Sequence, residues 1–585
     1  MTDETTQPET ESMPGEAAPE APSTPAASAA PAPRGRGRWY AAIGVAALAI
    51  VAIVAVAILA GRGGIVAGAP DYLPVTTVAY ADVRLDMPGD QRDQLAQLLS
   101  RFPGFADQAA FESKLDETFD RLLSQVGDGG YTYTGDVKPW FSGQVAVAIT
   151  SVPDFGGDAS PVPALGLIGV KDAAKARTSI EGILDKARGP GARVNEEAFE
   201  GATLWTVEDP SARTPDLGRA ALALTADMIV VGQDPAAVRA SLTLHAKGGA
   251  TLAGSAAFQE ALKPLAEARL GTLYVDGAAL KATLSAAMSG AATGMPGLDT
   301  ALATFPERIV GALRVEDGRV LGEARSTLPK SAEVPVDHAS DLAGRVPAKS
   351  LVYVEVHDVG QAIERLVTQV KSMPGIAEVT DQLKPVEGIL GTSLESFLDW
   401  VGDVAIVVDV AGDQPRGALV AQVKDTAVAG QRLGQLGALI QLAALDPSAG
   451  IHVTTSKHAD ATITELRIDQ VPGLAVAWAL KGDTFVIGVG EGSVEAVLDV
   501  TEATSLGADA RYRDALAAGG ASTDSAIAYV DLAATRSAIE AFIPAAERAR
   551  YDQDTKPWLE PLDRLIAVYF QDGQDAVART ILITQ

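Results

Sequence analysis

The feature that most constrains the fold is an internal repeat, because segments beyond residue 70 recur in the same order roughly 255 residues later. The first two matches lie 273 and 260 residues apart, so the first copy is the longer one there. From the third match onward the separation stays between 253 and 256 residues, which chance similarity between Ala- and Val-rich strings would not produce. The matched segments are 73–83 with 346–356, 140–147 with 400–407, 164–172 with 418–425, 227–232 with 483–488, 274–276 with 529–531, and 308–318 with 564–573.

This repeat predicts the domain organisation. We expect a first copy at 71–328, a linker at 329–345 and a second copy at 346–585. Short alternating or apolar runs predict strands in the first copy at 78–83, 144–150, 164–170, 220–225, 228–232, 271–276, 309–315 and 319–326. Helical periodicity predicts helices at 93–102, 109–126, 173–187, 235–245 and 258–268.

Hairpins mixed with single helices indicate an antiparallel sheet covered by helices. Asp317-Gly318 and Asp572-Gly573 are expected at hairpin turns, because such pairs supply the positive φ that a tight turn needs. The expected fold class is therefore α+β: two tandem copies of an antiparallel-sheet-plus-helices unit, preceded by one transmembrane helix and a disordered tail. A doubly wound parallel sheet is the alternative, since 164–187 could open a βαβ crossover.

The expected transmembrane helix spans 39–61, and its stretch from Trp39 to Ala60 is uncharged. Twenty-two helical residues are about 33 Å long, enough for a hydrocarbon core of about 30 Å. A cleaved signal peptide is the alternative, because 55–57 resembles a cleavage site, but its apolar region would be only about 7–15 residues. A buried helix of a soluble protein is a third interpretation.

The segment 1–38 is rich in Pro, Ala, Ser, Thr and Glu and has no periodic apolar residues, so it is expected to be a disordered cytoplasmic tail. Arg34, Arg36 and Arg38 precede the apolar stretch, whereas only Arg62 follows it closely. Positive charge favours the cytoplasmic side. The expected localisation is therefore the cell membrane, with the N-terminus cytoplasmic and the C-terminal region extracytoplasmic.

Charge and cysteine content exclude several classes of function. The formal net charge is −28, and nucleic-acid binding requires the opposite sign, so no nucleic-acid partner is expected. The chain has no cysteine, which excludes a disulfide framework, a Cys-ligated metal and a thiol nucleophile.

Motifs that resemble functional sites have simpler structural interpretations. Asp172 and Asp425, like Asp276 and Asp531, occupy matching places between an apolar strand and a helical run, where an aspartate caps the helix. The glycines of 488–492 lack the spacing of a dinucleotide fingerprint and are expected in a strand-to-helix turn. Aromatic residues at matching positions of the two copies are expected in the core: Trp140, Trp400, Tyr80, Tyr353, Tyr274 and Tyr529.

The histidines do not form a familiar metal motif. His452 and His458 are six residues apart, and no His-Glu-x-x-His string is present. His357-Asp358 could orient an imidazole, but Asp358 is better placed to start the following helix. The sequence therefore predicts no catalytic, cofactor-binding or metal-binding residues, no cofactor and no enzymatic activity.

The repeat also carries a family resemblance. The opening from Leu73 to Tyr80, the triplet 88–90, Phe102-Pro103 and the approach 138–140 to an apolar strand resemble the bacterial domain-of-unknown-function 3352 family. The resemblance covers most of 70–585 and implies a membrane-anchored envelope protein of high-GC bacteria. That family has no assigned activity, so it implies no site residues.

These observations lead to a ranked set of functional hypotheses. The first is a single-pass membrane-anchored extracytoplasmic protein with a non-enzymatic interaction or scaffolding role in the cell envelope. The alternative is a carrier of an apolar ligand such as a lipid, and a further alternative is an enzyme that lacks familiar motifs. The expected partners are the membrane and an envelope protein or a lipid.

Overall fold

The computed structural model describes residues 68–105, 107, 111–126, 131–151, 163–187, 193–208, 219–289, 303, 305–330, 338–372, 387–388, 391–412, 414–446, 448, 450–471, 474–521 and 525–585. The predicted tail at 1–38 and the predicted transmembrane helix at 39–61 lie outside these residues. Among the helices that are described, none is long and apolar enough to cross a bilayer.

Ten strands and their helices form the first half. The strands are β1 (Ala79–Arg84), β2 (Phe141–Ile149), β3 (Ala164–Val170), β4 (Arg193–Phe199), β5 (Ala202–Glu208), β6 (Arg219–Leu224), β7 (Met228–Gly232), β8 (Gly271–Asp276), β9 (Arg308–Glu316) and β10 (Arg319–Thr327). The helices are α2 (Gln91–Leu99), α3 (Phe111–Val126), α4 (Ala173–Ala187), α5 (Pro235–Lys247), α6 (Ala256–Leu262) and α7 (Gly277–Ser289).

The second half repeats this order. Its strands are β11 (Val352–Val356), β12 (Val401–Ala411), β13 (Gln414–Val423), β14 (Ile451–His458), β15 (Ala461–Ile468), β16 (Ala475–Lys481), β17 (Thr484–Val489), β18 (Ala526–Asp531), β19 (Leu562–Asp572) and β20 (Asp575–Thr584). Its helices include α9 (Val359–Ser372), α11 (Leu394–Phe397), α12 (Thr426–Ala443), α13 (Ser493–Leu498), α14 (Ala510–Gly519), α15 (Leu532–Glu540), α16 (Ala545–Arg550) and α17 (Lys556–Leu559), with the short turn η5 (Leu342–Gly344) near its start.

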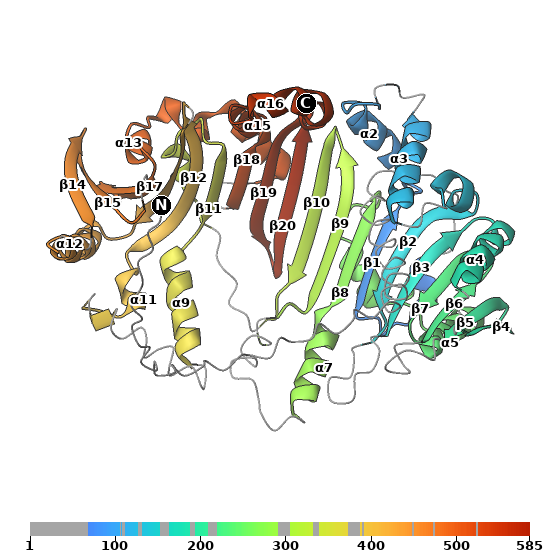
Figure 1. Ribbon diagram of the computed structural model, residues 1–585. Helices are drawn as coiled ribbons and strands as arrows, with labels where there is room; N and C mark the ends of the chain where they lie inside the picture. The colour runs from blue at the N-terminus through green and yellow to red at the C-terminus, as the bar shows by residue number, and fades with distance from the viewer. Residues whose placement is uncertain are drawn as a thin grey trace, which may run out of the picture.

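All twenty strands belong to one sheet in which every pair of neighbours is antiparallel. In the first half the spatial order is β4-β5-β6-β7-β3-β2-β1-β8-β9-β10. From β10 the sheet continues into the second half, in the order β20-β19-β18-β11-β12-β13-β17-β16-β15-β14. Each half therefore has the same strand order, and the two last strands, β10 and β20, pair with each other at the middle of the sheet (Figure 1).

The expected fold class needs correction on this point. Two tandem units were predicted, each with its own antiparallel sheet behind a transmembrane helix, but the described chain forms one continuous twenty-stranded sheet. The doubly wound parallel alternative is also wrong, because 164–187 leads from β3 through α4 into an antiparallel hairpin, β4–β5. The sequence signal for joining the halves was absent, because an edge strand and a central strand can have the same apolar pattern.

Most local predictions for the first half are confirmed. The eight predicted strands correspond to β1, β2, β3, β6, β7, β8, β9 and β10, and the five predicted helices to α2 through α6. The helix predicted at 258–268 is too long, because α6 ends at Leu262. The hairpin β4–β5 was missed because β4 is largely exposed and carries charged residues, so it lacks the alternating apolar pattern of a half-buried strand. Asp317 and Gly318 form the β9–β10 turn with positive φ. In the second half, however, Asp572 still pairs with Asp575, so the turn is 573–574.

The two faces of the sheet differ. We call the face that carries Tyr80, Tyr274, Tyr353 and Tyr529 the closed face, and the opposite face the open face. On the closed face, Tyr80 and Tyr274 pack against Phe258 of α6, and Tyr353 and Tyr529 pack against Tyr512 of α14. These matching tyrosines are buried, which confirms that they belong to the core. Trp140 and Trp400 are buried as well, in smaller clusters beside α4 and α12.

The continuous sheet predicts that damage at β20 spreads into the first half. Ile581, which is fully buried, lies opposite Leu321 of β10 and Ile566 of β19. We expect Ile581→Ala to lower the free energy of unfolding by about 2–5 kcal/mol because it leaves a cavity in this core. Hydrogen exchange measured by mass spectrometry should then accelerate in β9 and β10 as well as in β19 and β20.

The matched control is Ile406→Ala, because that side chain is half exposed and its loss leaves no enclosed cavity. Acceleration confined to the second half in Ile581→Ala would contradict a cooperative junction.

Candidate functional site

The open face of the sheet carries a continuous apolar surface. Residues directly opposite each other in antiparallel strands share a face. Val147 of β2 and Leu273 of β8 both lie opposite Ala81, and the same row continues to Tyr569 of β19 through Gly311, Ala324 and Ala578. In the second half, Val354 lies opposite Ile406, and Ile406 lies opposite Leu419.

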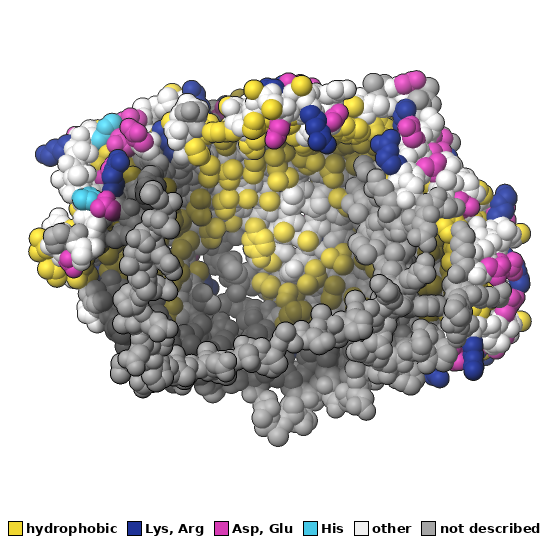
Figure 2. Space-filling view, viewed as in Figure 1, with side chains coloured by type: hydrophobic (Ala, Val, Ile, Leu, Met, Phe, Trp, Pro, Cys, Tyr) yellow, Lys and Arg dark blue, Asp and Glu magenta, His cyan; other side chains and the backbone are white. Residues whose placement is uncertain are grey.

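Several large apolar side chains of this face are exposed. Ile406 is 50% exposed and Tyr569 is 52% exposed, although both lie in strands at the interior of the sheet. The other exposed large apolar residues on the same face are Val147, Leu273, Val356, Val408 and Val489. Figure 2 shows hydrophobic side chains gathered over the central strands and a hollow in front of them.

Helices cover only parts of the open face. The core cluster of Val145, Ile180 and Leu184 places α4 over the outer strands of the first half, and the cluster of Val404 and Ala429 does the same for α12 in the second half. The α2 and α3 helices pack near one end of β9, where Val315 is buried. The middle of the open face, which carries Leu273, Ile406 and Tyr569, lies between these helices. We call this uncovered apolar surface the apolar trough.

The sheet edges are poor candidates for pairing with another strand. The outermost strand β4 carries Arg193, Glu196 and Glu197, and β14 carries His452 and Lys457. Charged side chains on an edge oppose the addition of a further strand. The apolar trough is therefore a better candidate for binding than either edge.

A pocket of about 340 Å³ lies on the closed face at the junction of the halves. Arg325 and Arg579 in its wall both pair with Glu323, and Arg325 also pairs with Asp572. These charges are already balanced within the wall. The pocket therefore belongs to the junction and is a weak candidate for a ligand site.

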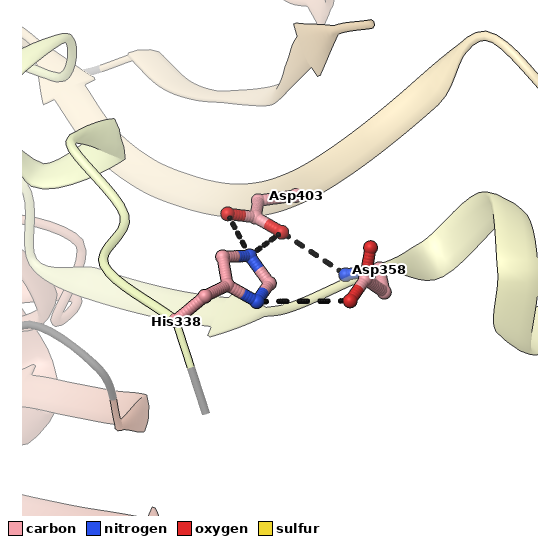
Figure 3. Close-up of side chains that lie close together, drawn as sticks. All are labelled: His338, Asp358 and Asp403. Carbon is pink, nitrogen blue, oxygen red and sulfur yellow. Dashed lines mark hydrogen bonds and ion pairs between the residues drawn. The ribbon is translucent and has the colours of Figure 1, made fainter. Parts of the chain in front are cut away.

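A second candidate is a group of titratable side chains at the start of the second half. His338 precedes η5, Asp358 precedes α9, and Asp403 lies on β12 beside a bulge between Val401 and Val404. The His338 Nε2 atom lies 2.9 Å from both carboxylate oxygens of Asp403 (Figure 3). The His338 Nδ1 atom lies 3.6 Å from Asp358 Oδ2. A strand bulge commonly re-aims a side chain, and here it directs the Asp403 carboxylate toward His338.

Backbone geometry also directs Asp358 into this group. Its φ of 48° is left-handed, which is uncommon for a residue other than glycine. Its backbone N–H donates to Asp403 Oδ1 over 3.0 Å, and its carboxylate Oδ1 accepts a bond of 3.1 Å from Lys424 Nζ. Asp358 does start α9, since its carbonyl accepts from Ala362 N–H, but its side chain points to His338 and Lys424.

Two further titratable residues, Glu355 and His357, lie close to Asp403. The His357 Nε2 atom is 3.3 Å from Glu355 Oε1, and the ring centroids of His338 and His357 are 4.7 Å apart. The Tyr353 phenol donates a hydrogen bond to Glu355 Oε2. Burial, together with the Glu355 carboxylate, raises the pKa of that phenol, which therefore remains a neutral donor.

We call His338, Glu355, His357, Asp358 and Asp403 the His338 cluster. It contains two overlapping groups of potential metal ligands, each with its ligand atoms within 4.8 Å of one another: His338 with Asp358 and Asp403, and Glu355 with His357 and Asp403.

The sequence of this protein can now be related to known proteins. The sequence model of a family described as "Protein of unknown function (DUF3352)" matches residues 41–574. The chain belongs to the DUF3352 family. The resemblance carried by Leu73 to Tyr80 and the later motifs is thereby confirmed.

No curated protein matches the sequence of this DUF3352 protein. A solved structure described as "Structure of crystal form III of TP0453" is 14% identical and covers 43% of this chain and 80% of its own, with a TM-score of 0.20. That score is too low to support a structural argument.

The capping aspartates of this DUF3352 protein lie where the sequence predicts. Asp425 accepts hydrogen bonds from two N–H groups at the start of α12, and Asp531 accepts one at the start of α15. Asp172 accepts a hydrogen bond from Lys175 N–H in α4, and Asp276 accepts one from Ala279 N–H in α7. The glycines of 488–492 lead from β17 into α13, so they form the predicted strand-to-helix turn.

Four of the five histidines contact acidic residues, and the fifth, His245, stacks on Tyr72. His452 and His458 make exposed contacts with Asp469 and Asp499. His338 and His357, nineteen residues apart in the chain, come together in the His338 cluster. No short motif links His338, 357–358 and Asp403, so the sequence alone does not indicate that these residues meet.

Adjacent residues of β12 test the assignment of the two faces. Val407 is 5% exposed on the closed face, whereas Ile406 is on the open face. We expect Val407→Thr to lower the free energy of unfolding by about 1–3 kcal/mol, because it buries a hydroxyl group for which the core offers no dedicated hydrogen-bond partner. Ile406→Thr, which also keeps a β-branched side chain, should lower it by less than about 1 kcal/mol. Chemical denaturation measures both values, and equal losses would contradict an open face at Ile406.

Proposed function

We propose that this DUF3352 protein binds the acyl chains of a lipid in the apolar trough of its open face, as a membrane-anchored protein of the cell envelope. The observation that carries the proposal is the row of exposed apolar side chains on interior strands, from Val147 through Leu273 to Tyr569. Interior strands of a sheet normally bury both faces or present polar groups to water. An exposed apolar patch of this kind is typical of an interaction site.

The chemistry of the trough favours an acyl chain. Between the large side chains of the row lie Ala81, Gly311, Ala324 and Ala578, which present little surface and no hydrogen-bonding side chain. Backbone groups of interior strands are already paired within the sheet, so the trough offers a ligand mainly apolar contact. A linear hydrocarbon needs no more than this, whereas a folded protein partner usually requires polar contacts at the rim.

The anchoring part of the proposal is supported by the sequence. The uncharged stretch from Trp39 to Ala60 precedes the sheet, and the arginines before it favour a cytoplasmic N-terminus. A trough held beside a bilayer would have lipid available to it. The proposed activity is binding, and no catalytic step is included.

A scaffolding role is the second candidate, and a different surface favours it. Ile539 of α15, Phe542 after it and Trp558 of α17 are all about half exposed, and Arg536 of α15 donates to Leu559 O. Exposed aromatic residues on neighbouring elements are typical of the centres of protein interfaces. A partner protein would dock here and leave the trough free.

Photocrosslinking tests the lipid proposal. The full chain is reconstituted in nanodiscs that contain a phosphatidylcholine with a diazirine in its acyl chain, and the labelled peptides are identified by mass spectrometry. We expect labels on β2, β8, β12 and β19. In Leu273→Glu/Ile406→Glu, labelling should fall about tenfold or more, because each buried aliphatic side chain contributes about 1.5–3 kcal/mol.

Ile183→Glu and Leu445→Glu are the matched controls, since both residues are exposed apolar residues outside the trough. Circular dichroism establishes that all variants remain folded. Labels restricted to 539–558, or labelling that the trough variant does not reduce, would overturn the lipid proposal. A reproducible protein crosslink to 539–558 would then favour the scaffolding role.

The absence of cysteine allows a direct test of the proposed topology. A single cysteine replaces Thr5 or, in a separate variant, the exposed Ser448. We expect a membrane-impermeant maleimide added to intact cells, with the outer permeability barrier opened, to label Ser448→Cys and to leave Thr5→Cys unlabelled until the cells are lysed. The reverse pattern would contradict the proposed orientation.

A further inference from the structure

We propose that the His338 cluster binds a divalent transition-metal ion of the zinc type, and that the ion ties the segment entering the second half to β11 and β12. This site is independent of the lipid proposal, because its residues lie outside the apolar trough. The cluster combines two imidazoles with three carboxylates, and its potential ligand atoms form two groups of close neighbours. Mixed nitrogen and oxygen ligands suit zinc and its neighbours, whereas calcium and magnesium prefer oxygen ligands alone.

The charge balance of the cluster calls for a cation. Asp403 and Glu355 are 1% and 4% exposed, so two carboxylates are buried close together. Among the described residues, the lysine or arginine that pairs with the cluster is Lys424. It contacts Asp358, which lies at the exposed side of the cluster. A buried carboxylate without a compensating cation is strongly unfavourable.

One buried oxygen is also without a hydrogen bond. Glu355 Oε2 receives the Tyr353 phenol, but Glu355 Oε1 accepts no hydrogen bond within the described chain and faces His357 Nε2 at 3.3 Å. Two ligands of a tetrahedral zinc ion are separated by about 3.4 Å. The His338 Nδ1 to Asp358 Oδ2 distance of 3.6 Å is close to the same value.

The positions equivalent to the His338 cluster in the first half carry different side chains. Tyr80 lies opposite Tyr274 as Tyr353 lies opposite Tyr529, so Asp82 corresponds to Glu355 and Arg84 to His357. Gln144 and Asp403 each precede the residue at which their strand resumes pairing after the bulge.

In the first half, the Asp82 carboxylate has a neutral amide, Gln144, and a permanent cation, Arg84, as its neighbours. Gln144 Nε2 donates to Asp82 Oδ2 over 3.2 Å, and the charge of Arg84 interacts with Asp82. Among the described residues, none donates a hydrogen bond to Asp82 Oδ1. In the second half Asp403 takes the place of the amide donor and His357 that of the guanidinium. The exchange removes one positive charge and adds one negative charge, while both new side chains can bind a metal.

The geometry also provides an entry route. The side chains of His338 and Asp358 are about one-third exposed, whereas that of Asp403 is 2% exposed. An ion would therefore enter between His338 and Asp358 and reach Asp403 at the base.

Calorimetric titration with Zn²⁺ alone tests the proposal on the full chain, purified in detergent and stripped with a chelator. We expect one ion per chain and much weaker binding of Ca²⁺. His338→Gln and Asp403→Asn should each weaken Zn²⁺ binding by about 10- to 100-fold. Lys424→Gln should strengthen it by about tenfold, because it removes a cation that competes for Asp358.

The strengthened binding of Lys424→Gln separates a metal site from a purely structural ion-pair network, which that substitution would only weaken. His452→Gln is the matched control, because His452 makes an exposed contact with Asp469 elsewhere in the second half. If Asp403→Asn fails to fold, His338→Gln supplies the same test, because the His338 side chain is about one-third exposed and less of it is buried than of Asp403. Stoichiometric Zn²⁺ binding that persists in His338→Gln, or no Zn²⁺ binding by the unmodified chain, would overturn the proposal.

Discussion

The architecture depends on the ladder between β10 and β20. Nine residue pairs join these strands, and Glu323 lies opposite Arg579 at their centre. Within their own hairpins Glu323 lies opposite Ala312 and Arg579 opposite Val568, so the two residues occupy equivalent positions of the repeat. A local two-fold axis therefore passes between them. In a symmetric dimer this position would face an identical residue, whereas here the charges are opposite and form an ion pair of 3.2 Å.

Joining the halves through their last strands gives the sheet one open face across the whole molecule. On the closed face, each half buries two tyrosines against a helix. On the open face, α4 and α12 cover the outer strands, and the middle stays apolar and exposed. Because the trough crosses the junction, its length depends on both halves. A single unit with the same strands would offer only half of it.

The two halves share their fold and differ in chemistry. The capping aspartates and buried tyrosines recur in both, because each serves local structure. The His338 cluster occurs in the second half, where the first half has Asp82, Arg84 and Gln144. A duplicated scaffold thus keeps its core residues in both copies. One copy can change the polar residues at a strand end without disturbing the sheet.

Sequence alone determined the repeat, most of the strands and helices of the first half, the helix caps and the family, since these depend on local periodicity and on short-range hydrogen bonds. Tertiary structure decided what local patterns do not encode. The pairing of β10 with β20 joins residues far apart in the chain, such as Glu323 and Arg579, which are 256 positions apart. The exposure of Ile406 depends on which helices cover its face, and the contact of His338 with Asp403 spans 65 residues. Such contacts are set by the path of the whole chain, because an apolar or charged residue has the same local pattern whether or not a partner reaches it.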